Sequence, residues 1–322
     1  FRAPDCKCVC FTKNVTESLN VLLKGFLRPG DHVLVSSMEH NAVMRPLRQL
    51  EAQGVSFSRV PCRSDGTLIF EAMAGLLQPN TRLVVMSHAS NVCGTLLPIA
   101  AVGAFCQEHG LRFFVDSAQT AGVFPIDMEA MHIDALAFTG HKGLLGPQGI
   151  GGFALREDLA AELTPLIAGG TGSMSASLEM PPTLPDRYEA GTPNLPGIMG
   201  LGVALRYLQE VGLDALHRRE MALTERFLSG LRGNEHIHIP GPADAKGRVG
   251  VISVDFLRQD NAEVAFQLEE QYGILTRCGL HCAPLAHKTL GTYPEGTVRF
   301  SIGYTTTEEE VDTAIRAIHD LA

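Results

Sequence analysis

The stretches Phe113-Phe114-Val115-Asp116 and Ala135-Leu136-Ala137-Phe138-Thr139-Gly140-His141-Lys142 share one pattern, a short apolar run that ends in polar side chains. Short continuous apolar runs are typical of strands that are buried on both faces of a sheet. In an open α/β sheet, ligands bind outside the carboxyl ends of the strands. We therefore expect Asp116 and Lys142 to lie together at a ligand crevice.

Similar runs alternate with helical patterns through the first half of the chain. The expected strands are residues 32–35, 55–60, 82–86, 112–116, 135–139 and 150–155, and the expected helices are residues 18–27, 41–53, 70–77 and 99–109. Continuous apolar strands that are separated by helices predict an α/β fold with a mostly parallel sheet, covered on both faces.

The second half of the chain differs in composition. Residues 164–196 are rich in Gly, Ser, Thr and Pro and predict a long ordered loop or lid. The later expected helices are residues 198–211, 214–231, 262–272 and 307–321, and the expected strands are 250–256 and 297–302. We place a large domain at residues 1–232 and a small C-terminal α+β domain at residues 233–322.

Composition excludes several classes of partner. The 322 residues carry a net charge of −9, and no basic stretch contains interleaved aromatic residues, so no nucleic-acid partner is expected. No apolar run approaches the roughly 20 residues that span a bilayer. There is no signal-peptide pattern, and eight scattered cysteines favour a reducing cytoplasm. The start at Phe1, without Met, indicates that the sequence begins inside a longer protein.

Three of the cysteines form the pattern Cys6-x-Cys8-x-Cys10 near the start of the chain. This spacing suits one face of an extended strand better than a zinc ribbon, and no Cys or His pair follows at ribbon spacing. A metal site there is the less favoured interpretation, and we expect none.

Lys142 and Asp116 together match the requirements of a pyridoxal-phosphate site. A lysine that is desolvated enough to lose its proton forms the Schiff base, and an acid keeps the pyridine nitrogen protonated so that the ring accepts electrons. Taken singly, Lys142 would be a solvated turn residue and Asp116 a helix cap. Gln119, one helical turn after Asp116, is placed to face the same ligand.

Two residues nearer the N-terminus have both a structural and a functional interpretation. Thr16 precedes an apolar helix, so it can cap that helix or give its hydroxyl to a phosphate beside free backbone N–H groups. His40 lies where a strand meets a loop and can stack on a pyridine ring or move protons. A lone histidine is nevertheless more often structural.

A second cluster, Arg277-Cys278-Gly279-Leu280-His281-Cys282-Ala283-Pro284, predicts a flexible loop. Arginine binds carboxylates through two hydrogen bonds, and a cysteine near cations is a better nucleophile. Cys282 is otherwise a small apolar filler. Arg299 lies within an apolar strand, where arginine usually has an anionic partner unless it is solvated at the surface.

These segments together resemble the class V aminotransferase superfamily of fold-type I pyridoxal-phosphate enzymes, and within it the SUF-type cysteine desulfurases, also called selenocysteine lyase-like. Five separate motifs occur in the right order between residues 11 and 301. The resemblance implies a large domain with a mostly parallel, seven-stranded type of sheet and a small C-terminal domain that carries the Arg/Cys loop.

The resemblance also implies roles for individual residues. Lys142 would form the Schiff base with the cofactor, with His141 beside it, and Thr16 and Thr139 would bind the cofactor phosphate. On the ring, Asp116 would pair with the pyridine nitrogen, Gln119 with the phenolic oxygen, and His40 would stack on its face. Asn91 would lie near the ring oxygen and the substrate carboxylate, and Thr192 would reach the phosphate of the partner subunit. Arg277 and Arg299 would hold the substrate carboxylate, and Cys282 would accept sulfur. The implied catalytic residues are Lys142, Cys282, His40 and Asp116.

The implied reaction converts L-cysteine, or selenocysteine, to L-alanine with a persulfide on Cys282, in a homodimer with shared sites. The sulfur would pass to an acceptor protein, for example in iron–sulfur cluster assembly. Another class V reaction, transamination or selenocysteine lysis, and a non-catalytic scaffold or sulfur-transfer protein stay open. Leu280 stands where many relatives have a second His and Val15 where many have Thr, and an N-terminal segment of such enzymes is absent.

Overall fold

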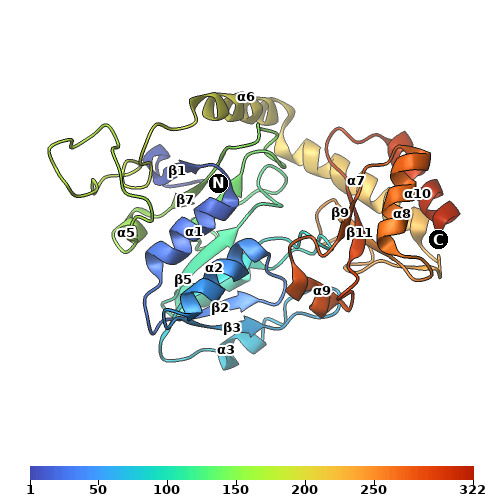
Figure 1. The fold of residues 1–322 in the computed structure, drawn as a ribbon, viewed down its shortest axis with the longest axis horizontal. Helices are drawn as coiled ribbons and strands as arrows, with labels where there is room; N and C mark the ends of the chain where they lie inside the picture. Colours follow the sequence, from blue (N-terminus) through green and yellow to red (C-terminus); the bar gives the residue numbers. More distant parts are fainter.

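Two β-sheets form the centres of two lobes that lie side by side in the computed structural model, which describes residues 1–322 (Figure 1). The strands of the larger sheet are β1 (Val9–Thr12), β2 (His32–Ser36), β3 (Ser56–Val60), β4 (Thr81–Ser87), β5 (Arg112–Asp116), β6 (Ala135–Thr139) and β7 (Gly151–Leu155). Their order is β1-β7-β6-β5-β4-β2-β3. The five strands from β3 to β6 pair in parallel, and β7 is antiparallel to both β6 and β1. The prediction of a mostly parallel seven-stranded sheet is confirmed.

Helices cover both faces of this sheet. Those of the large lobe are α1 (Val15–Phe26), α2 (Asn41–Glu51), α3 (Ala72–Gly75), α4 (Ile99–Glu108), α5 (Glu157–Ala160) and α6 (Leu195–Val211). Along β4, Leu83 and Val85 share a core with α1 and α2, whereas Val84 and Met86 share a core with α4 and α6. Because successive strand residues face opposite sides and both sides are buried, the strand sequences are continuously apolar.

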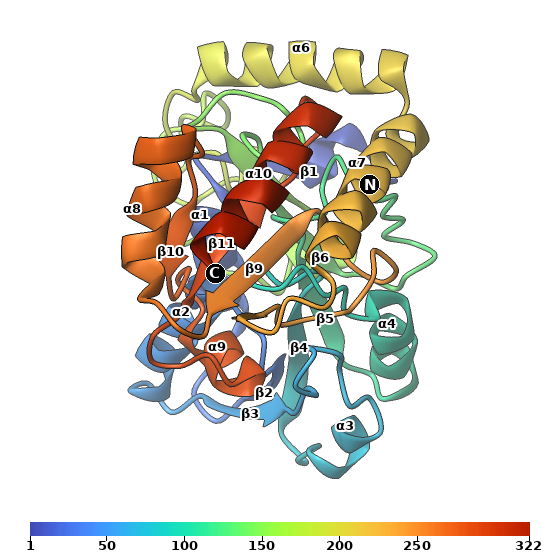
Figure 2. The same cartoon turned by 90° about the vertical axis from the view of Figure 1, so that its right-hand side faces the viewer.

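The small lobe is an antiparallel sheet with helices on one side. Its elements are α7 (Leu213–Leu231), β8 (Ile237–His238), β9 (Val251–Phe256), α8 (Asn261–Tyr272), β10 (Arg277–Gly279), α9 (Pro284–Leu290), β11 (Thr297–Ser301) and α10 (Glu308–Leu321). The strand order is β10-β11-β9-β8, and Figure 2 shows α8, α10 and α7 in front of it. Thr307 caps α10 reciprocally with Glu310. Phe227 of α7 precedes the predicted domain boundary at residue 232 and packs in the core of the small lobe. The boundary itself stays a prediction.

Several expected elements differ in detail because short segments carry little periodicity. Residues 277–279, expected in a loop, form strand β10 and pair with β11. Helix α1 begins at Val15, and its cap is Asn14, whose side chain accepts from the Glu17 amide. The interpretation of Thr16 as the cap is therefore wrong. The helix expected at residues 70–77 is reduced to α3.

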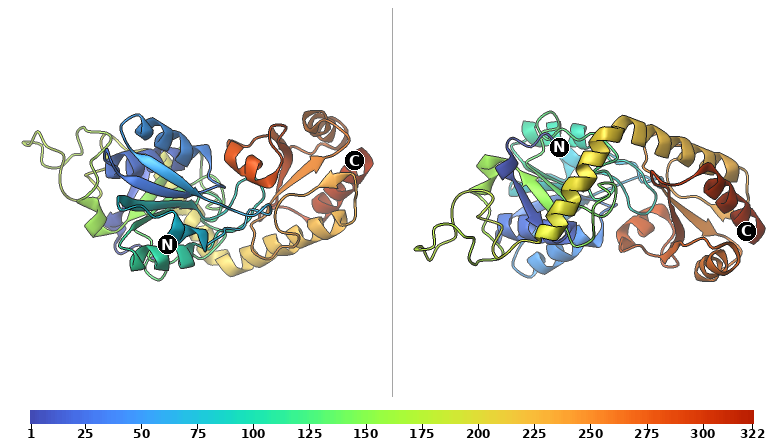
Figure 3. Two further views of the ribbon diagram at one scale, coloured as in Figure 1. Left: turned by 90° about the horizontal axis from the view of Figure 1, so that it is seen from below. Right: turned by 90° about the horizontal axis from the view of Figure 1, so that it is seen from above.

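The segment between α5 and α6 projects from the end of the large lobe that is farthest from the small lobe (Figure 3). It contains no helix or strand, as its Gly, Ser, Thr and Pro content predicts. Directly before β1, Cys6–Cys8 form a 3₁₀ turn instead of one face of a strand. No helix of the structure combines the length and apolar character needed to cross a membrane.

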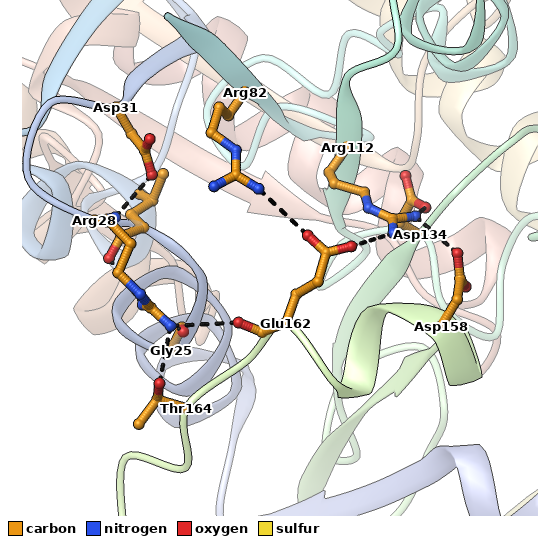
Figure 4. Close-up of polar contacts among 10 residues, drawn as sticks. Gly25, Arg28, Asp31, Arg82, Arg112, Asp134, Asp158, Glu162 and Thr164 are labelled. Atoms are coloured by element: carbon orange, nitrogen blue, oxygen red, sulfur yellow. Dashed lines mark hydrogen bonds and ion pairs between the residues drawn. The ribbon is translucent and has the colours of Figure 1, made fainter.

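Charged side chains connect the amino ends of the parallel strands, at the edge of the sheet opposite the site described below (Figure 4). Arg112, the first residue of β5, donates from Nη1 to Asp134 Oδ1 at 2.7 Å and to Asp158 Oδ2 at 3.1 Å, and it also pairs with Glu162. Arg82 Nη2 lies 3.4 Å from the other oxygen of Glu162. Burial raises the pKa of Asp134, and Arg112 opposes this shift. Arg112 is thus the main countercharge of a nearly buried carboxylate.

Arg112→Leu should lower the free energy of unfolding by about 3 kcal/mol, because it leaves a buried carboxylate without its main cation. Arg82→Leu is the matched control and should cost less than about 1 kcal/mol, because its ion pair is exposed. Urea denaturation followed by circular dichroism measures both. Equal losses in the two variants would contradict the unequal roles assigned to these arginines.

Candidate active site

Two adjoining hollows lie at the carboxyl ends of the parallel strands, between the lobes. The larger has a volume of about 350 Å³ and the smaller of about 40 Å³. Both are lined by His40, Asn91, Gln119 and Lys142. The smaller is also lined by Asp116, Ala118 and Val15, and the larger by Arg277, His281 and Arg299. The structure therefore brings together most of the predicted site residues in the expected crevice.

Lys142 follows β6 and points into this space. The side chain is accessible from the hollows, yet the surrounding protein desolvates its ammonium group and lowers its pKa. The Asp116 carboxylate opposes this shift, whereas Arg299 and Arg277 add to it. A lysine whose pKa is lowered has a larger neutral fraction at a given pH, which is what reaction with an aldehyde requires.

Asp116 ends β5 and is 5% exposed. Its Oδ1 accepts from the Ala118 amide at 2.9 Å, but only turns follow β5, so the interpretation of Asp116 as a helix cap is wrong. That bond is the only hydrogen bond the carboxylate receives, and the side chain lines the smaller hollow. Burial raises its pKa, and the Ala118 bond and Lys142 oppose the rise. A protonated pyridine nitrogen in the hollow would supply the missing donor and countercharge.

His40 caps helix α2, because its Nδ1 accepts from the Ala42 amide at 3.0 Å. The structural interpretation is thus correct, and the cap also fixes the ring where it lines both hollows. Burial, assisted by Lys142 and Arg277, lowers its pKa to about 4. The imidazole is therefore neutral near pH 7, with its proton on Nε2. Its stacking on a cofactor ring stays a prediction.

Glu39, which sequence reasoning missed, connects the ends of β2 and β4 behind this histidine. The carboxylate is fully buried and accepts from Ser36 Oγ at 2.5 Å, from the Ser87 amide at 3.1 Å and from Ser87 Oγ at 2.8 Å. Burial raises its pKa to about 7 although these donors oppose the rise. The sequence signal for these contacts was an acidic residue directly before His40, shortly after an apolar strand.

Predicted phosphate ligands gather where α1 meets β6 and β7. A Cβ on Gly151 would lie 2.7 Å from the Asn14 Cα, so the start of α1 is pressed against β7. Gly151 pairs with Thr139, whose Oγ1 lies 3.1 Å from His141 Nδ1. The Asn14 side chain accepts a hydrogen bond from the Glu17 amide. The Thr16 amide, in the first turn of α1, makes no hydrogen bond within the protein. A helix N-terminus with free amides beside hydroxyl groups suits an anion.

The small lobe contributes two arginines and a thiol. Arg277 and Arg299 are direct partners on β10 and β11, and neither has a carboxylate partner in the chain. Arg299 Nη1 donates to the Asn91 carbonyl at 3.2 Å, and its buried Nε has no partner. Arg277 Nη2 lies 3.5 Å from the sulfur of Cys282, which is exposed. Two unpaired guanidinium groups at the cavity suit a carboxylate ligand.

Four predicted cofactor residues line neither hollow, namely Thr16, Thr139, His141 and Thr192. Thr192 is exposed in the segment before α6. This position agrees with a role in a second subunit, which stays a prediction.

Fold and site together define a fold-type I pyridoxal-phosphate enzyme. The profile of the Aminotransferase class-V family matches residues 1–313, and the chain belongs to this family. It is 36% identical to a cysteine desulfurase of Klebsiella pneumoniae over 97% of this chain and 78% of that protein. The apo structure of a cysteine desulfurase from Thermococcus onnurineus matches 98% of this chain and 79% of its own, with a TM-score of 0.92 and 32% identity.

The residues present also fit the cofactor of this class. A structure of C-DES that holds glycine covalently linked to pyridoxal phosphate matches 98% of this chain and 81% of its own, with a TM-score of 0.83 and 26% identity. Here the underpartnered buried carboxylate of Asp116, the desolvated Lys142 and the free amides of α1 supply the complementary groups. The expectation of pyridoxal phosphate is confirmed, and the individual contacts remain predictions.

Borohydride reduction of the protein after incubation with pyridoxal phosphate should fix the label on Lys142. Because the pKa of Lys142 is lowered, its neutral fraction rises at lower pH than that of an exposed lysine, so the selectivity should grow as pH falls toward 7. Peptide mapping by mass spectrometry measures the site. Lysines such as Lys13 and Lys24 serve as internal controls, and equal labelling of them would contradict the assignment.

Proposed function

We propose that the protein is a pyridoxal-phosphate-dependent cysteine desulfurase that converts L-cysteine to L-alanine and takes the sulfur on Cys282. The observation that carries the proposal is the position of the Cys282 sulfur, 3.5 Å from the guanidinium of Arg277. Arg277 itself lines the cavity that contains Lys142. A nucleophilic thiol is thereby placed next to a substrate site with a lysine base, and the relatives named cysteine desulfurase support this assignment.

Substrate binding depends on the unpaired cations. Arg277 and Arg299 hold the α-carboxylate of L-cysteine, and the half-buried position of Arg299 strengthens this charge-assisted contact. Asn91 keeps Arg299 in place, because its carbonyl accepts from Nη1. The amino group and the β-carbon are then directed toward Lys142, which fixes the reacting atoms before any bond breaks.

Proton movement is assigned to Lys142. Its Nζ takes the α-proton, and the lowered pKa leaves a usable neutral fraction for this step. The bound cofactor supplies the electron sink. The Asp116 carboxylate, which receives one hydrogen bond from the protein, would keep the pyridine nitrogen of the cofactor protonated. His40 is neutral and orients the site instead of carrying charge.

Sulfur transfer then requires the thiol of the small lobe. The Cys282 sulfur attacks the substrate sulfur, an S–S bond forms and the Cβ–S bond breaks. The electron pair of the broken bond stays on carbon, which takes up a proton. L-cysteine and the Cys282 thiol thus give L-alanine and a Cys282 persulfide, and no external oxidant or reductant is needed.

We further infer a homodimer, a reducing cytoplasm and a protein sulfur acceptor, for example in iron–sulfur cluster assembly. Helix α6 exposes an apolar stripe of Leu195, Met199, Val203 and Tyr207 at intervals of one turn, and Thr192 precedes it. This face supports a second copy that shares the site. All eight cysteines are free, which supports the compartment. The exposed thiol of Cys282 supports delivery of sulfur to an acceptor.

Cys282→Ala should abolish alanine formation from L-cysteine, because no thiol remains to accept the sulfur. Cys278→Ala is the matched control, since Cys278 lies in the same cluster on β10 opposite Val298 and its thiol makes no hydrogen bond to the Arg277 guanidinium. Alanine and sulfide are measured with cofactor-loaded protein and a thiol reductant. Normal turnover by Cys282→Ala would refute the assigned sulfur acceptor, and release of a keto acid by the wild type would instead indicate transamination.

A further inference from the structure

His281 has no role in the proposed reaction, although it directly precedes Cys282 and lines the larger hollow. It is 2% exposed, whereas Cys282 beside it is exposed. Both residues have a left-handed backbone, with φ of 49° at His281 and 59° at Cys282. Residues other than Gly rarely adopt this backbone conformation, and two such residues in succession keep it only where the surrounding structure restrains them.

A chain of hydrogen bonds leads from the imidazole of His281 into the large lobe. His281 Nε2 lies 3.1 Å from Thr297 Oγ1, which donates to Ser253 Oγ at 2.9 Å. Ser253 Oγ in turn donates to the Val92 carbonyl at 2.8 Å. Each hydroxyl has a single proton, and both protons are used in the direction of Val92. The imidazole must therefore donate from Nε2.

Backbone contacts on either side of the imidazole tie the same turn to the large lobe. Asn91 Nδ2 donates to the His281 carbonyl at 2.7 Å. The Asn41 amide, at the start of α2, donates to the Cys282 carbonyl at 2.8 Å. The turn is thus held at two carbonyls and one buried ring, while the thiol of Cys282 stays free beside Arg277.

We propose that His281 is a positioning residue for Cys282, whose neutral imidazole anchors the left-handed turn through Thr297 and Ser253 and so fixes the thiol beside the substrate site. This inference rests on the proposed function of Cys282. Burial, assisted by Arg299, lowers the pKa of His281 to about 3, in agreement with a neutral ring. The buried Nδ1 has no partner, so the donor on Nε2 is the interaction that holds the ring.

Two pairs of variants separate this anchor from the backbone conformation. His281→Asn keeps a residue that tolerates positive φ but is too short to reach Thr297, whereas His281→Gln keeps a donor near Nε2. Thr297→Val removes the hydroxyl and Thr297→Ser keeps it. Thr292→Val is the control, because the hydroxyl of Thr292, a buried threonine of the same lobe, bonds to His287 outside this chain of hydrogen bonds.

The first measurement is amide hydrogen exchange of residues 277–283 in the cofactor-free protein, and the second is kcat and KM for L-cysteine in the loaded protein. His281→Asn and Thr297→Val should accelerate exchange about tenfold and lower kcat about tenfold, with KM changed less than about twofold. His281→Gln and Thr297→Ser should restore most of both values. Thr292→Val should match the wild type.

A wild-type result for His281→Asn together with a loss in His281→Gln would overturn the proposal, because backbone tolerance alone would then explain the site. Identical behaviour of Thr297→Val and Thr292→Val would overturn it as well. Absence of alanine with the wild type would refute the proposed function instead. In that case the exchange data, which need neither cofactor nor turnover, still decide whether His281 anchors the turn.

Discussion

The seating of the segment around Cys93 against the small lobe is the constraint on which the site depends. Arg248 is fully buried and donates to the carbonyls of Pro242 at 2.6 Å, Cys93 at 2.9 Å and Val251 at 2.9 Å. Gly94 adjoins this contact, and a Cβ there would lie 2.5 Å from the Val251 carbonyl. The two lobes therefore meet through main-chain atoms at a fixed distance. Because one lobe carries the lysine and the other the thiol, this junction sets the geometry of the reaction.

Charge at the cavity is unbalanced in a way that suits anionic ligands. Lys142, Arg277 and Arg299 face it, and burial lowers the pKa of Lys142 and Arg299. Glu220 of α7 also lines the cavity, but burial raises its pKa to about 7, so it compensates these cations only partly. Asp116 contributes its charge at the far end, in the smaller hollow. Cations without partners destabilise the empty site, and a phosphate and a carboxylate would relieve that cost on binding.

The sequence was most informative where burial is complete on both faces of the large sheet. Strands such as β5 and β6 are continuously apolar and end in polar residues, so both the fold and the Asp116–Lys142 pair were predictable. Strand β10 was not, because its three residues have no periodicity and its pairing with β11 is a tertiary contact. The contacts of Glu39 with Ser87 were missed for the same reason, since they depend on which strand ends become neighbours in space.

The contrast between Cys282 and its neighbour follows from the work required of the thiol. In the proposed reaction, the Cys282 sulfur first reaches the substrate and then meets an acceptor, so it has to be exposed. Exposed turns are mobile unless something buried restrains them. In this chain the restraint lies one residue away, in a histidine that is 2% exposed and connected to the opposite lobe. Because the same hydrogen bonds cross the junction between the lobes, a change in that junction would move the thiol and the lysine relative to each other. Different residues thus control the position and the exposure of the thiol, so the thiol can be exposed and still be held in place.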